Sequence, residues 1–506
     1  MTKNRKLIPI IFGFLLVLGG CAGPGAVGTQ APERSGIVHI TVLHMNDVYE
    51  ITPVQGGTRG GLARVATLRK RLLAQNPNTY TVLAGDFFSP SALGTARVNG
   101  KRLAGRQMVA TLNTLGLDLA TFGNHEFDLN ETDFRARISE SHFDWVSDNV
   151  SEPDGTPFSG IARSKIFVAK GLHRETVRIG FIGVTIPSNP RGYVRFADPF
   201  VLMKRAAERL RPNVDLLIGL THVAVAEDIR MVSEIPEIDL ILGGHEHDNY
   251  QLYRGNGGTP IFKADANART VYVIDLYYDT HTHSHTLRAR LQSITDAIPE
   301  DPETKAEVRR WVDMAYAAFG ADGFDAGAVV AAVPIPLDGR SAVVRNGETD
   351  LTNFIGTAML HADTSVSAAV YNSGSIRIDD EVPAGPVTQY DVIRILPFGG
   401  DVVTVKLTGA MLARVLEQGV KNRGSGGFLQ TAGITRDTGT GQWIIDGAPL
   451  DPAHTYTITT SDFLVSGRET GLDYFTLDNP DIKQIRTDGD VRRALIAELE
   501  RRFGGH

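Results

Sequence analysis

Residues 123–128 read Gly-Asn-His-Glu-Phe-Asp and directly follow the apolar run 117–122. Asn, His and Asp side chains can each ligate a transition-metal ion, and the glycine lets the backbone turn sharply without a Cβ in the way. A cluster of such ligands at the end of an apolar run is typical of a functional loop at the carboxyl end of a strand.

Four further segments repeat this pattern along the chain. They are Asn46-Asp47, Gly85-Asp86, Thr221-His222 and Gly243-Gly244-His245-Glu246-His247. Each follows a short run rich in Val, Ile and Leu, which predicts a buried strand. The four runs are 38–43, 80–84, 215–220 and 238–242. Helical patterns such as 61–73 lie between them, so the order indicates an α/β protein whose ligands collect beyond the carboxyl ends of its strands.

The number and type of these side chains predict a site for two metal ions. One bridging carboxylate can hold two ions roughly 3.5 to 4 Å apart, the spacing that clamps the attacking and leaving oxygens of an in-line displacement. A bound ion lowers the pKa of water towards neutrality, so no protein nucleophile is needed. We therefore expect a metal-bound hydroxide aimed at a phosphorus atom. The donor types suit two divalent metal ions drawn from Mn, Zn, Co, Fe and Mg.

These motifs, taken in order, resemble the calcineurin-like metallophosphatases, and within them the 5′-nucleotidase family with its fused C-terminal domain. The resemblance covers nearly the whole mature chain. It implies an α/β protein with a four-layer α/β/β/α metallophosphatase domain over 37–297. A smaller α+β substrate-binding domain over 326–506 would follow, joined by a helical linker over 298–325. Within this linker, residues 304–319 have the apolar face of a helix.

The resemblance also assigns roles to the residues of the site. One ion would be held by Asp47, Asp86 and His247. The second ion would be held by Asp86, Asn124, His222 and His245, so that Asp86 is the bridge. His125, oriented by Asp128, would stabilise the transferring phosphoryl group and protonate the leaving oxygen. Such a pairing fixes the tautomer and holds the imidazolium, whereas Glu126 is expected to be structural.

One residue departs from the family pattern at the first metal position. Family members usually read Asp-x-His in the first motif, whereas here Asp47 is followed at the same spacing by Tyr49. A neutral phenol is a poor ligand for a divalent ion, so either His247, which replaces a glutamine often seen in relatives, compensates, or this position binds its ion loosely. We expect compensation, because an imidazole is the stronger donor. The alternative is a scaffold that has lost one metal ion.

The C-terminal part resembles the substrate-binding domain of the same family. The matching segments are 345–348, 350–354, 371–377, 397–400 and 462–463. By this resemblance Arg345 and Arg377 would hold phosphate, Asn372 would contact the nucleobase, Phe398 and Phe463 would stack on it, and Asp473 would bond the ribose. Arginine offers a planar fork suited to phosphate, and stacking on an aromatic ring is worth roughly 1 to 3 kcal/mol per base.

Two observations bear on that assignment. An isolated Phe in an apolar segment is usually a core residue, and this is the alternative for both Phe398 and Phe463. In addition, the loop 466–472 is longer and bulkier than the Gly-Gly-Asp-Gly turn of relatives, with Leu472 where a glycine is expected. The longer loop bears directly on the sugar contact of Asp473.

The first 21 residues indicate an exported protein. Three basic residues precede the apolar stretch 7–18, which is too short to span a bilayer comfortably and is typical of a secretory signal. The signal ends at Leu-Gly-Gly-Cys, which resembles the bacterial lipoprotein cleavage site, and Cys21 is the only cysteine of the chain. We expect lipidation of Cys21, a membrane-anchored protein in the cell envelope, and a flexible tether over 22–36. The alternative is an ordinary signal peptide with an incidental cysteine.

Composition limits the possible partners. The chain has 506 residues, 42% of them hydrophobic, which is enough for more than one domain with a large core. Its net charge is −7 and no basic stripe occurs, so the pattern argues against a nucleic-acid partner. We expect an extracytoplasmic phosphoester hydrolase whose substrate is a nucleotide, most simply a 5′-nucleotidase. The alternatives are hydrolysis of UDP-sugars, 2′,3′-cyclic nucleotides or dinucleotides at the same site, or a non-catalytic nucleotide-binding lipoprotein.

Overall fold

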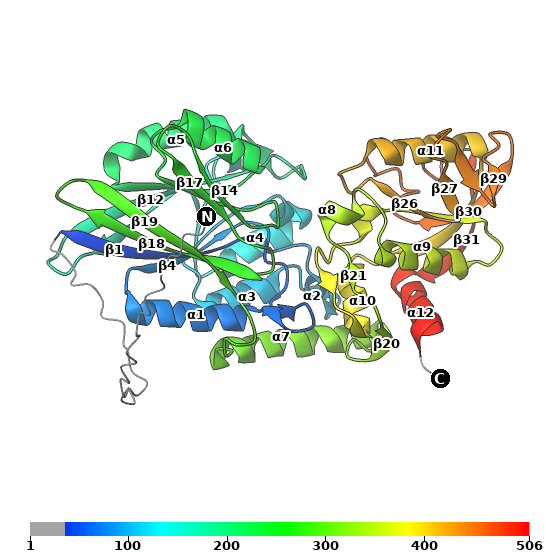
Figure 1. Ribbon diagram of the computed structural model, residues 1–506, viewed down its shortest axis with the longest axis horizontal. Coiled ribbons are helices and arrows are strands. Elements are labelled where there is room, and N and C mark those ends of the chain that lie inside the picture. Colours follow the sequence, from blue (N-terminus) through cyan, green and yellow to red (C-terminus); the bar gives the residue numbers. More distant parts are fainter. Residues whose placement is uncertain (1–35, 505–506) are drawn as a thin grey trace, which may run out of the picture.

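The computed structural model describes residues 36–504 (Figure 1). The predicted signal peptide 1–21, its lipidation residue Cys21 and the tether up to residue 35 lie outside the described residues. Among the described residues, no helix is both long and apolar enough to cross a membrane. The chain forms an α/β N-terminal domain and a smaller α+β C-terminal domain, joined by helix α7 (Pro302–Ala321), which confirms the predicted fold class.

Two β-sheets pack face to face in the N-terminal domain. The seven-stranded sheet has the order β10 (Ile161–Ala162), β8 (Asp144–Val146), β7 (Leu119–Thr121), β4 (Thr79–Ala84), β1 (Ile37–Met45), β18 (Thr270–Asp279) and β19 (Ser284–Ser293). The six-stranded sheet has the order β11 (Ser164–Lys170), β12 (Thr176–Thr185), β14 (Leu216–His222), β15 (Leu240–Gly243), β17 (Thr259–Lys263) and β16 (Tyr250–Arg254). The five predicted strands are therefore confirmed as β1, β4, β7, β14 and β15.

Helices cover the outer face of each sheet and complete the four layers (Figure 1). The first sheet carries α1 (Leu62–Gln75), α3 (Arg106–Leu115) and α4 (Glu131–Glu140). The second sheet carries α5 (Pro199–Leu210) and α6 (Val225–Glu234). Helix α1 is the helix that the apolar spacing over 61–73 predicts.

Strand β1 shows why an apolar run is needed at the centre of such a structure. Val38, Ile40 and Val42 point into the core between the two sheets. Leu43 and Met45 instead belong to the core under the helices of the first sheet. A strand that is buried on both faces must be apolar on both, so it reads as a continuous hydrophobic run and not as an alternating one.

The linker helix begins two residues before and ends two residues after the predicted range 304–319. Asp301 caps its N-terminus by accepting a hydrogen bond from the Thr304 N–H at 3.1 Å, and Pro302 occupies the first turn, where its missing N–H costs nothing. Helix α7 packs against α1 and α3, and it leads into strand β20 (Val329–Val333) of the C-terminal domain.

A five-stranded mixed sheet forms the centre of the C-terminal domain. Its order is β26 (Leu429–Ala432), β22 (Ala368–Asn372), β30 (Thr455–Ser461), β25 (Asp401–Thr408) and β31 (Ile482–Asp490). The helices of this domain include α8 (Ser341–Val344), α9 (Asp350–Ala362), α10 (Gln389–Ile395), α11 (Gly409–Lys421) and α12 (Val491–Phe503).

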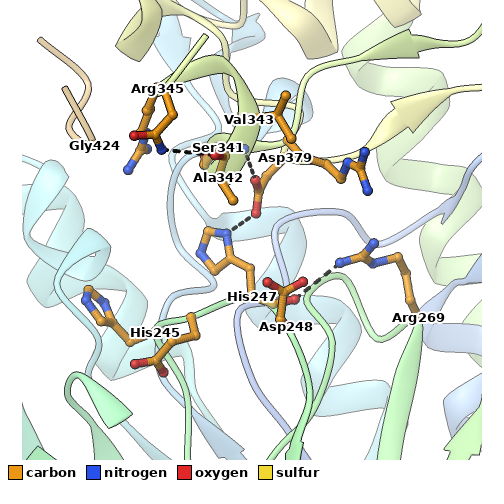
Figure 2. Close-up of a pocket in the computed structure, with 13 residues that line it drawn as sticks. His245, His247, Asp248, Arg269, Ser341, Ala342, Val343, Arg345, Asp379 and Gly424 are labelled. Atoms are coloured by element: carbon orange, nitrogen blue, oxygen red, sulfur yellow. Dashed lines mark hydrogen bonds and ion pairs between the residues drawn. The ribbon is translucent and has the colours of Figure 1, made fainter. Parts of the chain in front are cut away.

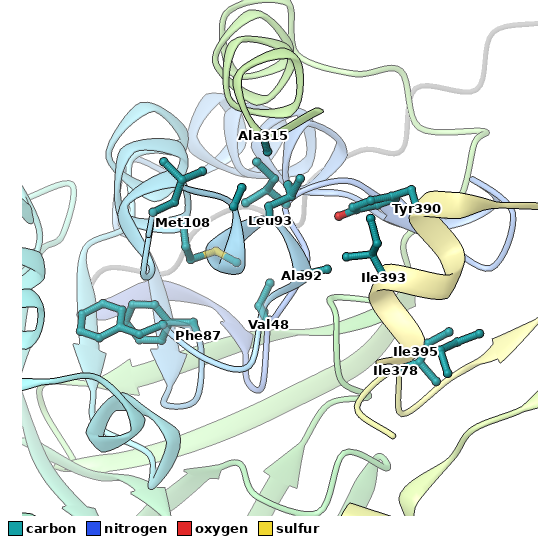
Figure 3. Packing of buried hydrophobic residues seen from close by; sticks show 14 of the residues in the cluster. Val48, Phe87, Ala92, Leu93, Met108, Ala315, Ile378, Tyr390, Ile393 and Ile395 are labelled. Atoms are coloured by element: carbon teal, nitrogen blue, oxygen red, sulfur yellow. The ribbon is translucent and has the colours of Figure 1, made fainter. Parts of the chain in front are cut away.

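The two domains are in contact through a buried apolar cluster and several polar bonds. Tyr390 and Ile393 of α10 belong to the same cluster as residues of the N-terminal domain and of α7 (Figure 3). The Tyr390 hydroxyl also donates to Glu50 at 3.0 Å, and the Gln55 amide donates to Asp380 at 2.8 Å. These contacts place the segment around 377–380 beside the loop that follows β1.

Candidate active site

The predicted metal ligands lie on loops at the carboxyl ends of strands in both sheets. Asp47 follows β1, Asp86 follows β4, Asn124 follows β7, His222 ends β14, and His245 and His247 follow β15. Four of them have a left-handed backbone, with φ of 53° at Asp47, 56° at Asp86, 92° at His245 and 64° at His247. Residues other than glycine adopt this conformation rarely, and it persists only where surrounding contacts enforce it.

Glu126 enforces the backbone around Asp86. Its buried carboxylate accepts hydrogen bonds from four backbone N–H groups. The donors are Asp86 at 2.9 Å, Phe87 at 2.7 Å, Phe88 at 3.1 Å and Gly123 at 2.6 Å. Burial and the neighbouring charge of Asp86 raise the pKa of Glu126 to about 7, against the opposing effect of the backbone donors. Glu126 therefore ties the loop after β4 to the loop after β7, the structural role that we expect for it.

A buried lysine supports the loops of the second sheet. The Lys263 ammonium is fully buried and donates to the carbonyls of Val223 at 2.7 Å and Gly244 at 2.8 Å. It also pairs with the carboxylates of Asp228 at 2.8 Å and Glu246 at 2.5 Å. Because Val223 follows His222 and Gly244 precedes His245, Lys263 fixes both histidine loops. The sequence offers no local signal for this role, since the partners lie on separate segments.

Asp47, Asp86 and His247 form a compact group that could hold a metal ion. One ligand atom from each lies within 4.8 Å of the other two. The Nε2 atom of His247 is 3.3 Å from Asp47 Oδ1. The Nε2 atom of His222 approaches the other side of the site, 3.2 Å from Asp86 Oδ2. Asp86 thus lies between the predicted ligands of the first ion, Asp47 and His247, and His222, a predicted ligand of the second ion. This is the position that a bridging carboxylate needs.

The second group shows donor atoms that suit an ion. Asn124 Oδ1 is buried and has no hydrogen-bond partner among the described residues, and His222 Nε2 faces the carboxylate of Asp86. Buried polar atoms are normally satisfied, so the unpartnered oxygen of Asn124 favours a metal-binding role. The other ring nitrogen of His222 contacts the Ala84 carbonyl at 2.8 Å, which orients the ring. The His245 ring lies 5.3 Å from the His222 ring between centroids.

The charges of the two groups are strongly coupled. Burial opposes a charge on His222, but the carboxylates of Asp86 and Asp47 prevail and raise the pKa of His222 to about 9. Burial and the charge of His222 lower the pKa of His245 to about 4. Despite burial, His222 in turn holds the pKa values of Asp47 and Asp86 below their usual range. Despite burial, Asp379 and Asp47 also raise the pKa of His247, so the carboxylates of the site face the imidazolium rings of both His222 and His247, an environment that favours positive charge.

His125 and Asp128 have the geometry of an acid with an orienting partner. His125 Nδ1 lies 2.7 Å from Asp128 Oδ2, and the His125 backbone N–H donates to Asp86 Oδ1 at 2.7 Å. Asp128 is held in turn by the Ser89 hydroxyl at 3.1 Å and the Asn189 amide at 3.0 Å. The imidazole therefore lies beside the ligands and directs its Nε2 atom away from Asp128. Sequence reasoning missed Ser89 and Asn189, which lie outside the motifs.

Tyr49 lies within the first group of ligands and not beside it. Its hydroxyl oxygen is 2.8 Å from His247 Nε2 and 3.3 Å from both Asp47 Oδ1 and Asp86 Oδ2. Burial and the neighbouring charge of Asp86 raise the pKa of Tyr49 well above its usual value. The sequence places Tyr49 at the spacing of a ligand, but only the structure shows that its oxygen reaches the ligand atoms.

A carboxylate of the C-terminal domain reaches the metal ligands. Asp379 Oδ2 is bonded to His247 Nδ1, and Asp379 Oδ1 accepts the Ser341 N–H at 2.5 Å (Figure 2). Although burial opposes the charge, His247 holds the pKa of Asp379 below its usual range. Sequence reasoning missed Asp379, because its only signal is its position two residues after Arg377.

A cleft of about 300 Å³ opens between the two domains at this point. The side chains around it include His245, His247, Arg269, Arg340, Arg345 and Asp379 (Figure 2). Metal ligands from one domain and arginines from both therefore border the same space. A phosphate group in this cleft would meet cationic groups on two sides.

The other predicted substrate residues are distributed around this region. Arg345 borders the cleft, and Arg377 lies beside Tyr49 in a small neighbouring cavity. The Arg377 guanidinium carbon is 5.4 Å from the centre of the Phe398 ring, and Phe398 is 47% exposed. An exposed ring beside the arginine that is predicted to bind phosphate suits stacking better than a core role.

The predicted contacts at the far side of the nucleobase are altered. The Asn372 amide donates to Glu469 at 3.0 Å, so a carboxylate of the longer loop already accepts one of its two N–H donors. Phe463 packs against the core of the C-terminal domain and carries Arg468 on its ring at 5.3 Å. Asp473 is exposed. Glu469 is a candidate substrate residue that the sequence shows only as part of an unusually long loop.

The chain matches two families of known proteins. The family described as calcineurin-like phosphoesterase matches residues 40–249, and the family described as 5′-nucleotidase, C-terminal domain matches residues 328–476. The chain is 26% identical to the snake venom 5′-nucleotidase of Naja atra, over 93% of this chain and 97% of that protein. It is also 26% identical to the trifunctional nucleotide phosphoesterase protein YfkN of Bacillus subtilis, over 88% of this chain but only 33% of that protein.

A solved structure has the same overall arrangement of domains. The 5′-nucleotidase precursor from Thermus thermophilus superposes with a TM-score of 0.74 at 25% identity. The superposition covers 92% of this chain and 97% of the Thermus protein.

Proposed function

The chain belongs to the calcineurin-like phosphoesterases that carry a 5′-nucleotidase C-terminal domain, it is a metal-dependent phosphoester hydrolase, and we propose that its substrates are nucleoside 5′-monophosphates. The observation that carries this proposal is the cleft of about 300 Å³ in which metal ligands of one domain face Arg345 of the other. A nucleotide in this cleft would place its phosphate at the ligands and its nucleoside on the C-terminal domain.

Different residues of the chain would have different roles in the proposed reaction. Bound metal ions supply a nucleophile derived from water near neutral pH and neutralise charge on the phosphoryl oxygens. Arg345 and Arg377 hold the phosphate and orient it for in-line attack. Asp128 holds His125 at Nδ1, 2.7 Å away, so His125 Nε2 is free to donate a proton to the leaving 5′-oxygen.

The nucleoside would lie against Phe398 and the Asn372–Glu469 pair. The exposed ring of Phe398 offers a stacking face for any base. Asn372 and Glu469 lie 3.0 Å apart and together present amide and carboxylate groups. A carboxylate accepts hydrogen bonds only, so Glu469 would favour a base edge that carries N–H donors.

A second candidate function rests on Tyr49. If its hydroxyl permanently occupies the space among Asp47, Asp86 and His247, the chain is a nucleotide-binding protein that does not hydrolyse its ligand. The two candidates differ in metal content and in phosphate release. Hydrolysis of UDP-sugars, 2′,3′-cyclic nucleotides or dinucleotides would use the same residues as the proposed reaction.

The test is phosphate release by the purified full chain, first stripped of ions and then supplied with Mn²⁺ or Co²⁺. AMP should release phosphate with added ion and not without it. It should also be cleaved faster than UDP-glucose, 2′,3′-cyclic AMP or a dinucleotide, whose phosphomonoester products are measured by chromatography. A matched variant, His125→Gln, should bind the same amount of ion but turn over slowly. Cleavage of none of these esters, despite bound ion and bound AMP, would identify the non-catalytic alternative.

We also propose that the protein is exported and anchored in the cell envelope through a lipid on Cys21. The support is the basic and apolar pattern of residues 1–21 and the single cysteine at the predicted cleavage point. In cells that express the full chain, Cys21→Ser should move the protein from the membrane fraction to a soluble fraction. Unchanged fractionation of this variant would contradict the anchor.

A further inference from the structure

Helix α10 connects the interface between the domains to the predicted substrate residues. Tyr390 and Ile393 on this helix belong to the apolar cluster that both domains share (Figure 3). At the end of the helix, the Ile395 carbonyl accepts the backbone N–H of Arg377 at 3.0 Å. Phe398 follows three residues later, with its ring centre 5.4 Å from the Arg377 guanidinium carbon. The residues predicted to hold the phosphate and the base therefore both depend on the position of this helix end.

Arg394 in the last turn of α10 is a buried cation that joins three segments of the chain. Its side chain is only 8% exposed, and its guanidinium lies among three carboxylates. The nitrogen–oxygen distances are 3.8 Å to Glu50, 3.8 Å to Asp380 and 3.7 Å to Asp391. Glu50 belongs to the N-terminal domain, and the two aspartates belong to the C-terminal domain. A buried charge depends strongly on such partners, because removal of one leaves the others uncompensated.

Two hydrogen bonds across the domain boundary hold the carboxylates around Arg394. The Tyr390 hydroxyl donates to Glu50 at 3.0 Å, and the Gln55 amide donates to Asp380 at 2.8 Å. Each bond joins one residue of the N-terminal domain to one residue of the C-terminal domain. The full set of partners around Arg394 therefore exists only while the two domains are packed together.

The cluster around Arg394 lies directly beside Arg377. Both arginines line the same cavity of about 10 Å³, together with Glu50. The Nε atom of Arg377 is buried and has no hydrogen-bond partner within the part of the chain that the structure describes. The Arg377 side chain is therefore oriented by the groups packed around it, and Arg394 is one of these groups.

We propose that Arg394 is a positioning residue for the nucleotide: held by Glu50 across the domain boundary, it fixes the end of α10 and thereby aligns Arg377 and Phe398. The inference rests on the proposed function, because Arg394 acts on the substrate only through those two residues. Packing of the domains brings Glu50 to Arg394 in the same arrangement that brings Arg345 to the metal ligands. Tight binding of the phosphate and of the base therefore requires the packed arrangement.

The test is the steady-state kinetics of the purified full chain, supplied with Mn²⁺, on AMP. Arg394→Met should raise KM for AMP and the inhibition constant of inorganic phosphate at least about tenfold and lower kcat less, because a displacement of about 1 Å can cost about 100-fold. Arg394→Lys keeps the positive charge and should lie closer to the wild type. Arg137→Met is a matched control, since Arg137 is 5% exposed and donates to the carbonyls of Leu103 and Ala104. It should lower thermal stability and leave both constants unchanged.

A double-mutant cycle shows whether Arg394 acts through Arg377. In an Arg377→Met background, Arg394→Met should change the inhibition constant of phosphate by less than about twofold. Glu50→Gln removes only the carboxylate charge of the N-terminal domain and should raise the same constant in the wild-type background, which keeps the test valid if Arg394→Met does not fold. The assignment is overturned if folded Arg394→Met and Glu50→Gln keep both constants of the wild type, or if the effects of Arg394→Met and Arg377→Met multiply.

The same samples distinguish failure of this inference from failure of the proposed function. Hydrolysis of AMP by the wild type, with unchanged constants in the variants of Arg394 and Glu50, would overturn only the role of Arg394. A wild-type chain that neither binds nor cleaves AMP would overturn both proposals.

Discussion

Replacement of Asp379 by asparagine should weaken the first metal position from the opposite domain. In the wild type, Asp379 Oδ2 is bonded to His247 Nδ1 and Asp379 Oδ1 accepts the Ser341 N–H. Asparagine keeps the size of the side chain but removes its charge. The variant therefore tests whether the carboxylate orients His247 and strengthens its bond to an ion.

The burial of the His247–Asp379 pair determines how much metal affinity the variant should lose. The side chains of His247 and Asp379 are only 21% and 9% exposed, so solvent screens their interaction little. Loss of an outer partner of a metal ligand typically lowers metal affinity by about 10 to 100-fold. This factor corresponds to about 1.4 to 2.7 kcal/mol of binding free energy.

Calorimetric titration of the ion-free full chain with Mn²⁺ measures this effect. One of two binding events should weaken by that factor, and the other should stay unchanged because the hydrogen-bond partners of Asp379 are His247 and Ser341 and not the ligands of the second ion. Glu381→Gln is a matched control, since Glu381 is two residues away, partly exposed and paired with Arg340 instead. Two unchanged binding events in a folded Asp379→Asn variant would refute the role of the carboxylate.

Three further changes test other parts of the site. His125→Gln should lower turnover of AMP by about 10²- to 10⁴-fold, and that of p-nitrophenyl phosphate much less, because only the alkoxide needs a proton; a loss of bound metal would show instead that His125 is a ligand. Phe398→Ala should raise KM for AMP by about 5- to 150-fold through lost stacking, whereas an equal rise for p-nitrophenyl phosphate would argue against a base contact. Lys263→Met should lower the free energy of unfolding by about 3 to 5 kcal/mol, since Asp228 and Glu246 would lose their buried partner; a thermal unfolding scan like that of the exposed control Lys305→Met would contradict this.

The parts of the fold that depend on short segments could be predicted from the sequence. Strands β1, β4, β7, β14 and β15 are buried on both faces, so each appears as a continuous apolar run followed by a polar turn. The ligand segments follow these runs directly, and their positions relative to the strands are fixed within a few residues. Local sequence is therefore sufficient to find them.

The contacts that complete the site depend on segments far apart in the sequence. Asp379 is 132 residues from His247, and Lys263 is 40 residues from Val223. No local pattern distinguishes such residues from ordinary surface or core positions. Tyr49 shows a different difficulty. The sequence shows its spacing from Asp47, but only the structure shows that its hydroxyl contacts Asp47, Asp86 and His247.

Because the predicted ligands come from two sheets, the order in which the sheets fold affects when metal ions can bind. The first sheet alone carries Asp47, Asp86 and Asn124, and the three histidine ligands arrive only with the second sheet, later along the chain. Neither half of the domain has a full set of donors, and His247 gains its carboxylate partner only once the C-terminal domain has docked. A chain in which only one sheet has folded therefore lacks the complete set of predicted donors, and full metal loading would require both sheets to have packed together.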